Sequence, residues 1–141
     1  MTAVSIAVES PRGPGIAELL RDGETYAESL YPAEENFILP LSALEKPGVT
    51  VFVARVDGRA LGMAALVLAG SGAELKRLYV AEAARGQGLG KAVIDFVVAE
   101  ARTQGFKAVR LEVERHNARA RRVYAAAGFA AHDRDLLTLP L

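Results

Sequence analysis

The sequence of 141 residues contains no cysteine, and this absence excludes several kinds of chemistry. A chain without thiols has no disulfide bonds, no thiolate ligands for a metal ion and no covalent cysteine intermediate. The two histidines, His116 and His132, lie apart in the sequence, and neither belongs to a paired acidic motif. We therefore expect no metal site.

The chain also lacks an excess of charge of either sign. Lys plus Arg and Asp plus Glu each number 17, so the formal net charge is zero. Nucleic-acid-binding domains usually carry a basic surface, so we expect no nucleic acid partner. With 51% hydrophobic and 24% charged residues, the composition is that of an ordinary globular protein. The length suits a single domain that spans residues 1–141.

Long apolar runs are absent as well. No run approaches the roughly 20 residues that a transmembrane helix needs. Residues Met1 to Ser10 do not show the basic region followed by an apolar region of a signal peptide. These features predict a cytoplasmic protein without a membrane partner.

Periodicity and turn residues predict an alternation of strands and helices. The expected strands are Val4–Val8, Thr50–Val56, Ala60–Ala69, Ala73–Val80, Ala108–Val113, Phe129–Ala131 and Leu136–Leu139. The expected helices run from Ile16 to about Leu30, over one or two turns of Leu39–Leu44, from the region of Leu89 to about Thr103, and over Ala118–Ala127. Short turns make the three central strands an antiparallel meander, and a right-handed crossover leads to a parallel strand. The fold class is therefore α/β, in the mixed α+β sense, with helices packed against a mixed sheet.

A glycine-rich loop, Arg85-Gly86-Gln87-Gly88-Leu89-Gly90, lies between a predicted strand and a predicted helix. The first turn of a helix has unpaired N–H groups and the positive end of the helix dipole, and glycines let an anion approach them. Arg85 and Lys91 add positive charge, although the hexamer alone is also compatible with a simple turn. Two other phosphate-binding loops are excluded. A Walker A loop would need a hydroxyl residue at Ala92, and a dinucleotide fingerprint would need its third glycine at Lys91 or Val93.

The spacing Arg-x-x-Gly-x-Gly resembles the pyrophosphate-binding segment of the GNAT superfamily of N-acetyltransferases. A second stretch, Leu111-Glu112-Val113 followed by Asn117, Tyr124 and Gly128-Phe129, is similar to a further motif of that superfamily. The two motifs occur in the expected order and on the expected elements. Together they cover about Thr50 to Phe129.

This resemblance implies a GNAT-like fold, with a central mixed and mostly antiparallel sheet and helices on both faces. It implies acetyl-CoA as cosubstrate, no metal, and direct attack of an amine on the thioester within a ternary complex. Tyr124 corresponds to the general acid near the thioester sulfur, and Asn117 to the residue that bonds the pantetheine arm. Either residue also has a structural reading, Tyr124 as a core aromatic and Asn117 as a helix N-cap. The full set of expected coenzyme-binding residues is Leu78, Tyr79, Val80, Arg85, Gly86, Gln87, Gly88, Leu89, Gly90, Lys91, Asn117 and Tyr124.

The catalytic base has two candidates, and the resemblance does not choose between them. Glu74 corresponds to the glutamate of histone-type members, and Glu112 to that of ribosomal-protein-type members. Both can also be ordinary strand carboxylates, and a water chain can replace them. Strand alternation predicts that Glu74, Lys76, Leu78 and Val80 share one face, with Leu75, Arg77 and Tyr79 on the other. The backbone N–H of Tyr79 or Val80 is the expected oxyanion donor by resemblance.

The acceptor is expected to be the amine of a small molecule or amino acid. Residues Tyr31 to Asn36 fall where relatives form the acceptor side, and Glu34 and Glu35 there attract cations or are ordinary loop charges. A group of arginines on the last expected helix has two readings, a solvated face or a contact with the 3′-phosphate of coenzyme A. The group consists of Arg115, Arg119, Arg121 and Arg122. Two alternatives stay open: a protein lysine or N-terminal acetyltransferase, and a non-catalytic acyl-CoA-binding sensor. Small GNAT proteins often pair through sheet edges, so the resemblance also implies a homodimer.

Overall fold

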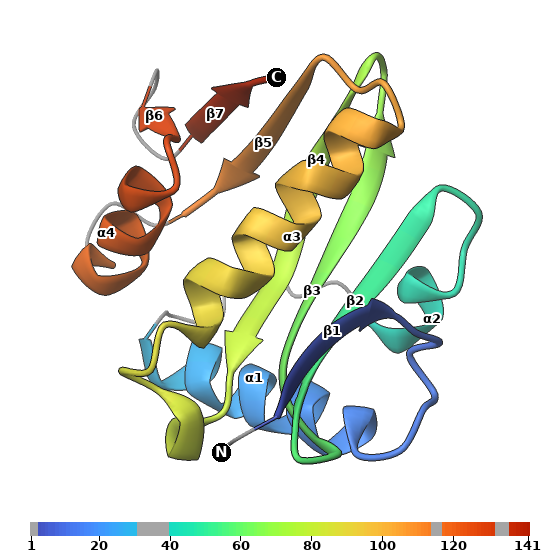
Figure 1. Cartoon of the computed structure of the whole chain (residues 1–141), viewed down its shortest axis with the longest axis vertical. Helices are drawn as coiled ribbons and strands as arrows, with labels where there is room; N and C mark the ends of the chain where they lie inside the picture. The colour runs from blue at the N-terminus through green and yellow to red at the C-terminus, as the bar shows by residue number, and fades with distance from the viewer. Residues whose placement is uncertain (1–2, 31–39, 114–116, 132–135) are drawn as a thin grey trace.

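A computed structural model describes residues 3–30, 40–113, 117–131 and 136–141. Within these residues seven strands form one sheet, in the order β1-β2-β3-β4-β5-β7-β6 (Figure 1). The strands are β1 (Val4–Val8), β2 (Val49–Val56), β3 (Arg59–Ala69), β4 (Gly72–Val80), β5 (Ala108–Glu112), β6 (Ala130–Ala131) and β7 (Leu136–Pro140). The helices are α1 (Ile16–Leu30), α2 (Leu41–Leu44), α3 (Leu89–Thr103) and α4 (Ala118–Ala126), with a 3₁₀ turn η2 (Glu82–Ala84) before α3.

The sheet is mostly antiparallel, as predicted. Among the described strands β4 and β5 form the parallel pair, and the other neighbours run antiparallel. Residues Asp57 and Gly58 join β2 to β3 with φ angles of 50° and 85°. Positive φ at both central residues is what a two-residue hairpin turn requires. The predicted fold class is therefore confirmed, and sequence reasoning missed mainly the short turn η2.

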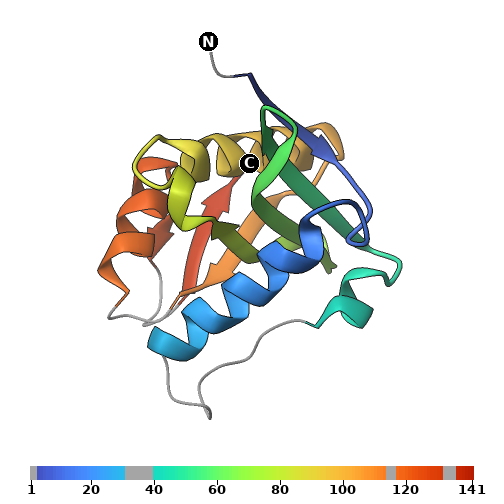
Figure 2. The same ribbon diagram turned by 90° about the horizontal axis from the view of Figure 1, so that it is seen from below.

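Helices cover both faces of the sheet (Figure 2). On one face α1 and α2 contribute Ile16, Leu20 and Leu44 to a buried apolar cluster with the sheet. On the other face α3 and α4 build a second cluster, which includes Val97 and Tyr124. Adjacent residues of β2 and β3 enter opposite clusters, so these central strands are buried on both sides. This burial explains their nearly continuous apolar sequence.

A bulge in β4 changes which residues share a face, and it corrects the predicted alternation. The register with β3 shifts between Met63 and Ala65, and Arg77 has a left-handed backbone with φ of 57°. A bulge adds a residue to one strand and so reverses the alternation beyond it. Leu78 consequently packs in the α3-side cluster with Leu75. The prediction that Leu78 and Val80 share the face of Glu74 was wrong for this reason.

The side chain of Arg77 fastens the bulge to α1. Its Nη2 donates to the carbonyl oxygen of Leu20 at 3.1 Å, and its Nη1 lies 3.4 Å from Oε1 of Glu24. The side chain is only 8% exposed. This burial lowers the pKa of Arg77 from its ordinary value, and the nearby Glu24 carboxylate partly opposes the shift. The bulge and α1 are therefore coupled through one buried arginine.

Strands β4 and β5 separate soon after they meet. Within the described residues they pair at Ala73 with Val109 and at Glu74 with Arg110. Beyond these pairs β4 continues to Val80 next to β3, while β5 continues to Glu112 next to β7. In Figure 1 the two strands diverge toward their arrowheads, with β5 to the left of α3 and β4 passing behind the helix. We call this opening, between residues 75–80 of β4 and 111–112 of β5, the split.

Candidate active site

The glycine-rich loop leads from the end of β4 into α3. Gly86 and Gly88 have φ angles of 79° and 78°, and Gly88 is the N-cap of the helix. Only glycine adopts this left-handed conformation without strain. A Cβ at either position would meet nothing within 4 Å, so space is open beside the backbone. The first-turn N–H groups of α3 therefore border a free surface that suits an anion.

Gly90 holds the start of α3 close to the rest of the site. A Cβ at this position would lie 3.6 Å from Val80 Cγ2 and 4.0 Å from Val123 Cγ1. The first turn of α3 thus packs against the end of β4 and against α4. The third glycine of the motif consequently serves close packing, whereas the first two serve the loop conformation.

Val80 presents its N–H group to the split. The amide of Ala81 donates to the carbonyl oxygen of Leu61 on β3 at 2.8 Å. Successive amides of a strand point to opposite edges, so the Val80 N–H points toward the side from which β5 has separated. By the same alternation Tyr79 points its N–H toward β3. Of the two expected oxyanion donors, the geometry favours Val80.

The second motif builds α4 and its two ends. The side chain of Asn117 accepts a hydrogen bond from Ala120 N at 3.2 Å, which confirms the N-cap reading. At the other end Phe129 N donates to Tyr124 O at 3.1 Å, and Gly128 has φ of 100°. This is a Schellman ending, in which the residue after the glycine packs on the last turn. The rings of Tyr124 and Phe129 lie 5.8 Å apart, and Tyr124 is 8% exposed.

The two candidate bases lie at different ends of the split. Glu74 is at its closed end, near Lys76 Nζ at 3.5 Å and Arg110 Nη2 at 3.6 Å. Glu74 pairs with Val67 of β3 and Val80 with Gly62, five positions along, so Glu74 lies roughly 17 Å from Val80 at about 3.3 Å per residue. Glu112 ends β5 and is exposed, on the face opposite the buried Leu111. Strand alternation places it on the α1 side of the sheet.

The positive residues of the loop do not both lie where the sequence suggests. Lys91 pairs with Asp95 at 2.7 Å on the exposed surface of α3. The guanidinium of Arg85 instead lies over the ring of Tyr26 on α1, with Cζ 4.5 Å from the ring centroid. It also contacts Tyr79, whose ring is 6.1 Å from that of Tyr26. Sequence reasoning did not single out Tyr26, because its position on α1 gives no sign of a partner 59 residues later.

Gly23 explains how α1 comes close to this aromatic pair. A Cβ at Gly23 would lie 3.4 Å from Cγ of Tyr79, so the glycine leaves room for the ring. A glycine inside a helix is less favourable than alanine by roughly 0.5–1 kcal/mol. The structure shows a packing reason for it.

Several expected residues lie outside the described part of the chain. These are Tyr31 to Asn36 with Glu34 and Glu35, the first arginine of the basic group, Arg115, and both histidines, His116 and His132. Within the residues that the structure describes, no cluster of three acidic or histidine side chains is arranged to hold a metal ion. No helix in these same ranges is long and apolar enough to cross a membrane.

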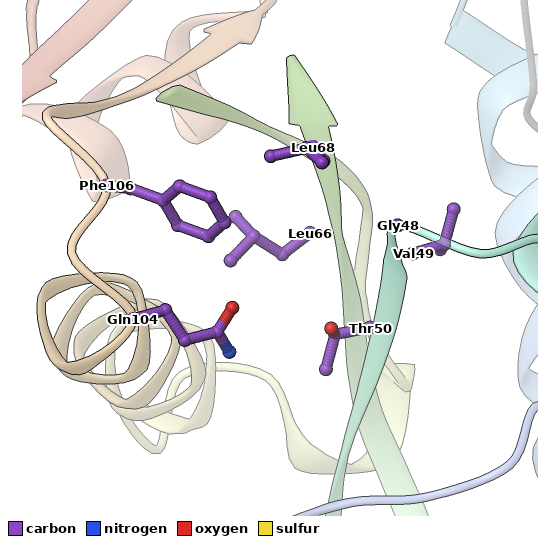
Figure 3. A pocket seen from close by; sticks show the side chains of 7 residues that line it. All are labelled: Gly48, Val49, Thr50, Leu66, Leu68, Gln104 and Phe106. Atoms are coloured by element: carbon purple, nitrogen blue, oxygen red, sulfur yellow. The ribbon is translucent and has the colours of Figure 1, made fainter. Parts of the chain in front are cut away.

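A small pocket lies at the opposite end of α3 (Figure 3). Thr50, Leu66, Gln104 and Phe106 are among the residues that line it, and none of its lining residues is ionisable. In Figure 3 Gln104 and Phe106 come from the end of α3 and the segment after it, and Thr50 and Leu66 come from the neighbouring strands. Without an acid, a base or a positive charge, this pocket does not provide the groups that group transfer requires.

Comparison with known proteins identifies the family. A sequence model of the acetyltransferase (GNAT) family matches residues 14–129. The IAA acetyltransferase of Azospirillum brasilense is 36% identical over 132 residues, which are 92% of this chain and 86% of that protein. The chain belongs to the GNAT acetyltransferase family. It is therefore an acyltransferase, and acetyl-CoA is its cosubstrate.

Solved structures confirm the GNAT fold. The chain matches the PaiA N-acetyltransferase of Thermoplasma acidophilum, which was solved in complex with coenzyme A. The TM-score is 0.78 at 17% identity, over 99% of each chain. It also matches the IAA acetyltransferase of Bacillus cereus ATCC 14579, with a TM-score of 0.77 at 18% identity over 99% of this chain and 100% of that one.

Proposed function

We propose that this GNAT enzyme transfers the acetyl group of acetyl-CoA to the primary amine of a small molecule, by direct attack within a ternary complex. One observation carries the proposal: the split between β4 and β5 opens toward the N-terminus of α3. A long donor can therefore place its diphosphate at the helix and its thioester in the sheet. The absence of cysteine agrees with a route that has no acyl-enzyme.

The coenzyme would occupy the loop and the split. The N–H groups of Gly86 to Lys91 would hold the pyrophosphate, as the helix dipole and the glycine conformations favour. The pantetheine arm would lie along Leu78, Tyr79 and Val80, with Asn117 on its other side. Asn117 begins α4 and also lies after the end of β5, so one residue can cap the helix and contact the arm.

The transferring carbonyl would lie beside the end of β4. The N–H of Val80 would stabilise the oxyanion of the tetrahedral intermediate, because it points into the split. The leaving thiolate, with a pKa of about 8.5 if it behaves like cysteine, benefits from a proton donor. Tyr124 would supply this proton from α4, which packs against α3 and the end of β4.

Glu112 is the better placed of the two candidate bases. An alkyl ammonium has a pKa near 10, so it must lose a proton before it attacks. Glu112 lies at the open end of the split and on the α1 side of the sheet, where the acceptor would approach. Glu74 lies at the closed end and is flanked by two cations. We therefore assign the base to Glu112 and an ion-pairing role to Glu74.

Coenzyme A release from acetyl-CoA, measured against a panel of amines, amino acids and short peptides, tests the function. Release with small amines supports the proposal, and release with peptides alone would favour a protein lysine or N-terminal acetyltransferase. Tight binding of acetyl-CoA without release for any acceptor would favour an acyl-CoA sensor. Absence of acetyl-CoA binding would overturn the assignment of the loop.

The quaternary structure and the cellular location stay predictions. Strand β1 is at the edge of the sheet and exposes Val4 and Val8 by 53% and 55%. An exposed apolar edge strand favours pairing with another chain, which supports a homodimer. Sedimentation of the wild type and of a Val8→Lys variant would test it. We also retain the cytoplasm as the expected location.

A further inference from the structure

The side chain of Arg85 is held in place by aromatic rings on the α1 side of the sheet. Its Cζ lies 4.5 Å from the centroid of the Tyr26 ring and 5.5 Å from that of Tyr79. Its Nε donates to the carbonyl oxygen of Val80 at 3.1 Å, and its Nη2 lies 3.4 Å from the hydroxyl of Tyr79. Ring faces attract a guanidinium, and these contacts fix its position. Arg85 is thus an oriented cation at the end of β4.

Arg85 differs from two other half-buried arginines in its partners. Arg55 is 2.8 Å from Glu9, and Arg77 is 3.4 Å from Glu24. Within the described ranges the partners of Arg85 are a carbonyl and a phenol, and no carboxylate lies within ion-pair distance of it. A guanidinium has five N–H donors, and a carboxylate can accept two of them side by side. The guanidinium of Arg85 is therefore fixed in position and has further N–H groups that can donate to a ligand.

We propose that Arg85, enclosed by Tyr26 and Tyr79, binds a carboxylate of the acceptor, so that the acceptor is an amino acid or a similarly small amine that carries a carboxylate. The inference rests on the proposed function, because the same site must take an amine. It reassigns the side chain of Arg85 from the coenzyme to the acceptor and leaves the loop backbone to the pyrophosphate.

The position of the enclosure favours the acceptor over the coenzyme. Tyr26 belongs to α1, and Tyr79 packs in the cluster on the α1 side. The first turn of α3, where the pyrophosphate would bind, covers the opposite face. Glu112 lies on the α1 side as well. A cation for the carboxylate and a base for the amine consequently occupy the same face, next to the same split.

Distances limit the size of the acceptor. The guanidinium is one hydrogen bond, 3.1 Å, from the carbonyl of Val80. The guanidinium itself spans about 2 Å, and a carboxylate on its outer edge would be about 3 Å beyond it, which makes roughly 8 Å from the strand end. The amine must reach the thioester near that strand end, so few bonds can separate it from the carboxylate. This spacing suits an α-amino acid.

Matched acceptors and matched variants test the inference. We would measure coenzyme A release with free amino acids and with the corresponding amino acid amides, for the wild type, Arg85→Met and Arg102→Met. Arg102 lies exposed in the last turn of α3 and controls for the loss of one positive charge. We expect Arg85→Met to lower kcat/KM for the acids by roughly 10- to 100-fold, the effect of losing charged hydrogen bonds. The ratio of its kcat/KM for the acids to its kcat/KM for the amides should fall by a similar factor while its Kd for acetyl-CoA stays that of the wild type, and Arg102→Met should change none of these values.

Three results would overturn the inference, and they differ in what they say of the proposed function. Equal turnover of acids and amides by the wild type would remove the carboxylate requirement while the enzyme assignment stands. A loss of acetyl-CoA affinity in Arg85→Met, with acids and amides affected alike, would return Arg85 to the coenzyme pyrophosphate. If no acceptor turns over, the amino acids are titrated by calorimetry into protein saturated with coenzyme A, to measure whether they bind. Absence of binding there refutes the inference, whereas failure of acetyl-CoA itself to bind refutes the proposed function.

Discussion

Two glycines at opposite ends of α3 have the same backbone conformation and different surroundings. Gly88 begins the helix with φ of 78°, and Gly105 follows its end with φ of 83°. A Cβ would meet no atom within 4 Å at either position. Backbone strain is therefore equal at the two positions, while only Gly88 borders the proposed pyrophosphate site.

Because the two glycines share a backbone conformation, one serves as the control for a substitution of the other. Gly88→Ala and Gly105→Ala should each lower the free energy of unfolding by about 1 kcal/mol, because a left-handed backbone is unfavourable for alanine. Only Gly88→Ala should weaken acetyl-CoA binding, by about tenfold or more, since its methyl group displaces an anion from the N–H groups. Urea unfolding and calorimetry measure the two effects. Equal acetyl-CoA affinity in both variants would contradict the loop assignment.

A substitution can separate the role of the Tyr124 hydroxyl from that of its ring. The ring packs against Phe129 at a centroid distance of 5.8 Å, and phenylalanine would preserve this contact. Tyr124→Phe should retain the fold, measured by circular dichroism, and its affinity for acetyl-CoA. Its kcat should fall by about 10²- to 10⁴-fold, the range for loss of a general acid. Turnover at the wild-type rate would reduce Tyr124 to a core aromatic.

Two glutamine variants distinguish the candidate bases. Glu112→Gln should lower kcat by about 10²- to 10⁴-fold, because the amide cannot accept the proton of the amine. Glu74→Gln should leave kcat unchanged and cost less than about 1 kcal/mol of stability, since its ion pairs are partly exposed. Steady-state kinetics at saturating acetyl-CoA measure both. The reverse outcome would move the base to the closed end of the split.

At the scale of secondary structure, the bulge of β4 depends on its anchor in α1. Arg77→Met removes the bond to the Leu20 carbonyl and the contact with Glu24. We expect the free energy of unfolding to fall by about 1–3 kcal/mol, as for other buried charged hydrogen bonds. Glu24→Gln is the matched control. It keeps an acceptor for Arg77, so it should cost less than about 1 kcal/mol. Similar losses in both variants would mean that the arginine does not anchor the bulge.

The order and type of the elements could be predicted from local patterns. Turn residues such as Asp57-Gly58 and the cap at Asn117 act over a few positions, so the sequence reveals them directly. The bulge at Arg77 could not be predicted, because an ordinary residue takes the left-handed backbone there. Its side chain is held by contacts with α1, more than 50 residues earlier. The reversed alternation of Leu78 and Val80 follows from the bulge that these long-range contacts hold.

The candidate site shows the same division. The left-handed backbone at Gly86 and Gly88, just before α3, could be predicted from the sequence, because this conformation strongly favours glycine. Side-chain placement was not. The sequence joins Arg85 to the phosphate loop, whereas the structure joins it to Tyr26 on another element. Motifs therefore predict backbone conformation better than they predict which partner each charged side chain takes.

At the scale of the whole molecule, the two apolar clusters enclose a sheet that is continuous except at the split. The amide of Val80 should exchange its hydrogen rapidly in the free enzyme and slowly once acetyl-CoA is bound. The amide of Phe52, a fully buried residue of β2, should be protected in both states. Hydrogen-exchange mass spectrometry or NMR measures the two rates. Equal protection of Val80 with and without the coenzyme would show that the arm does not lie along β4.

The split also links the stability of the folded protein to the concentration of acetyl-CoA. A ligand that binds only the folded state stabilises it by mass action, by about 2.7 kcal/mol when its concentration is 100 times its Kd. In the proposed complex that ligand would lie between β4 and β5, where the described residues do not pair with each other beyond Glu74 and Arg110. Starvation for acetyl-CoA would therefore leave this enzyme easier to unfold and easier for proteases to cut. Its abundance would then follow the metabolic state of the cell as well as its synthesis.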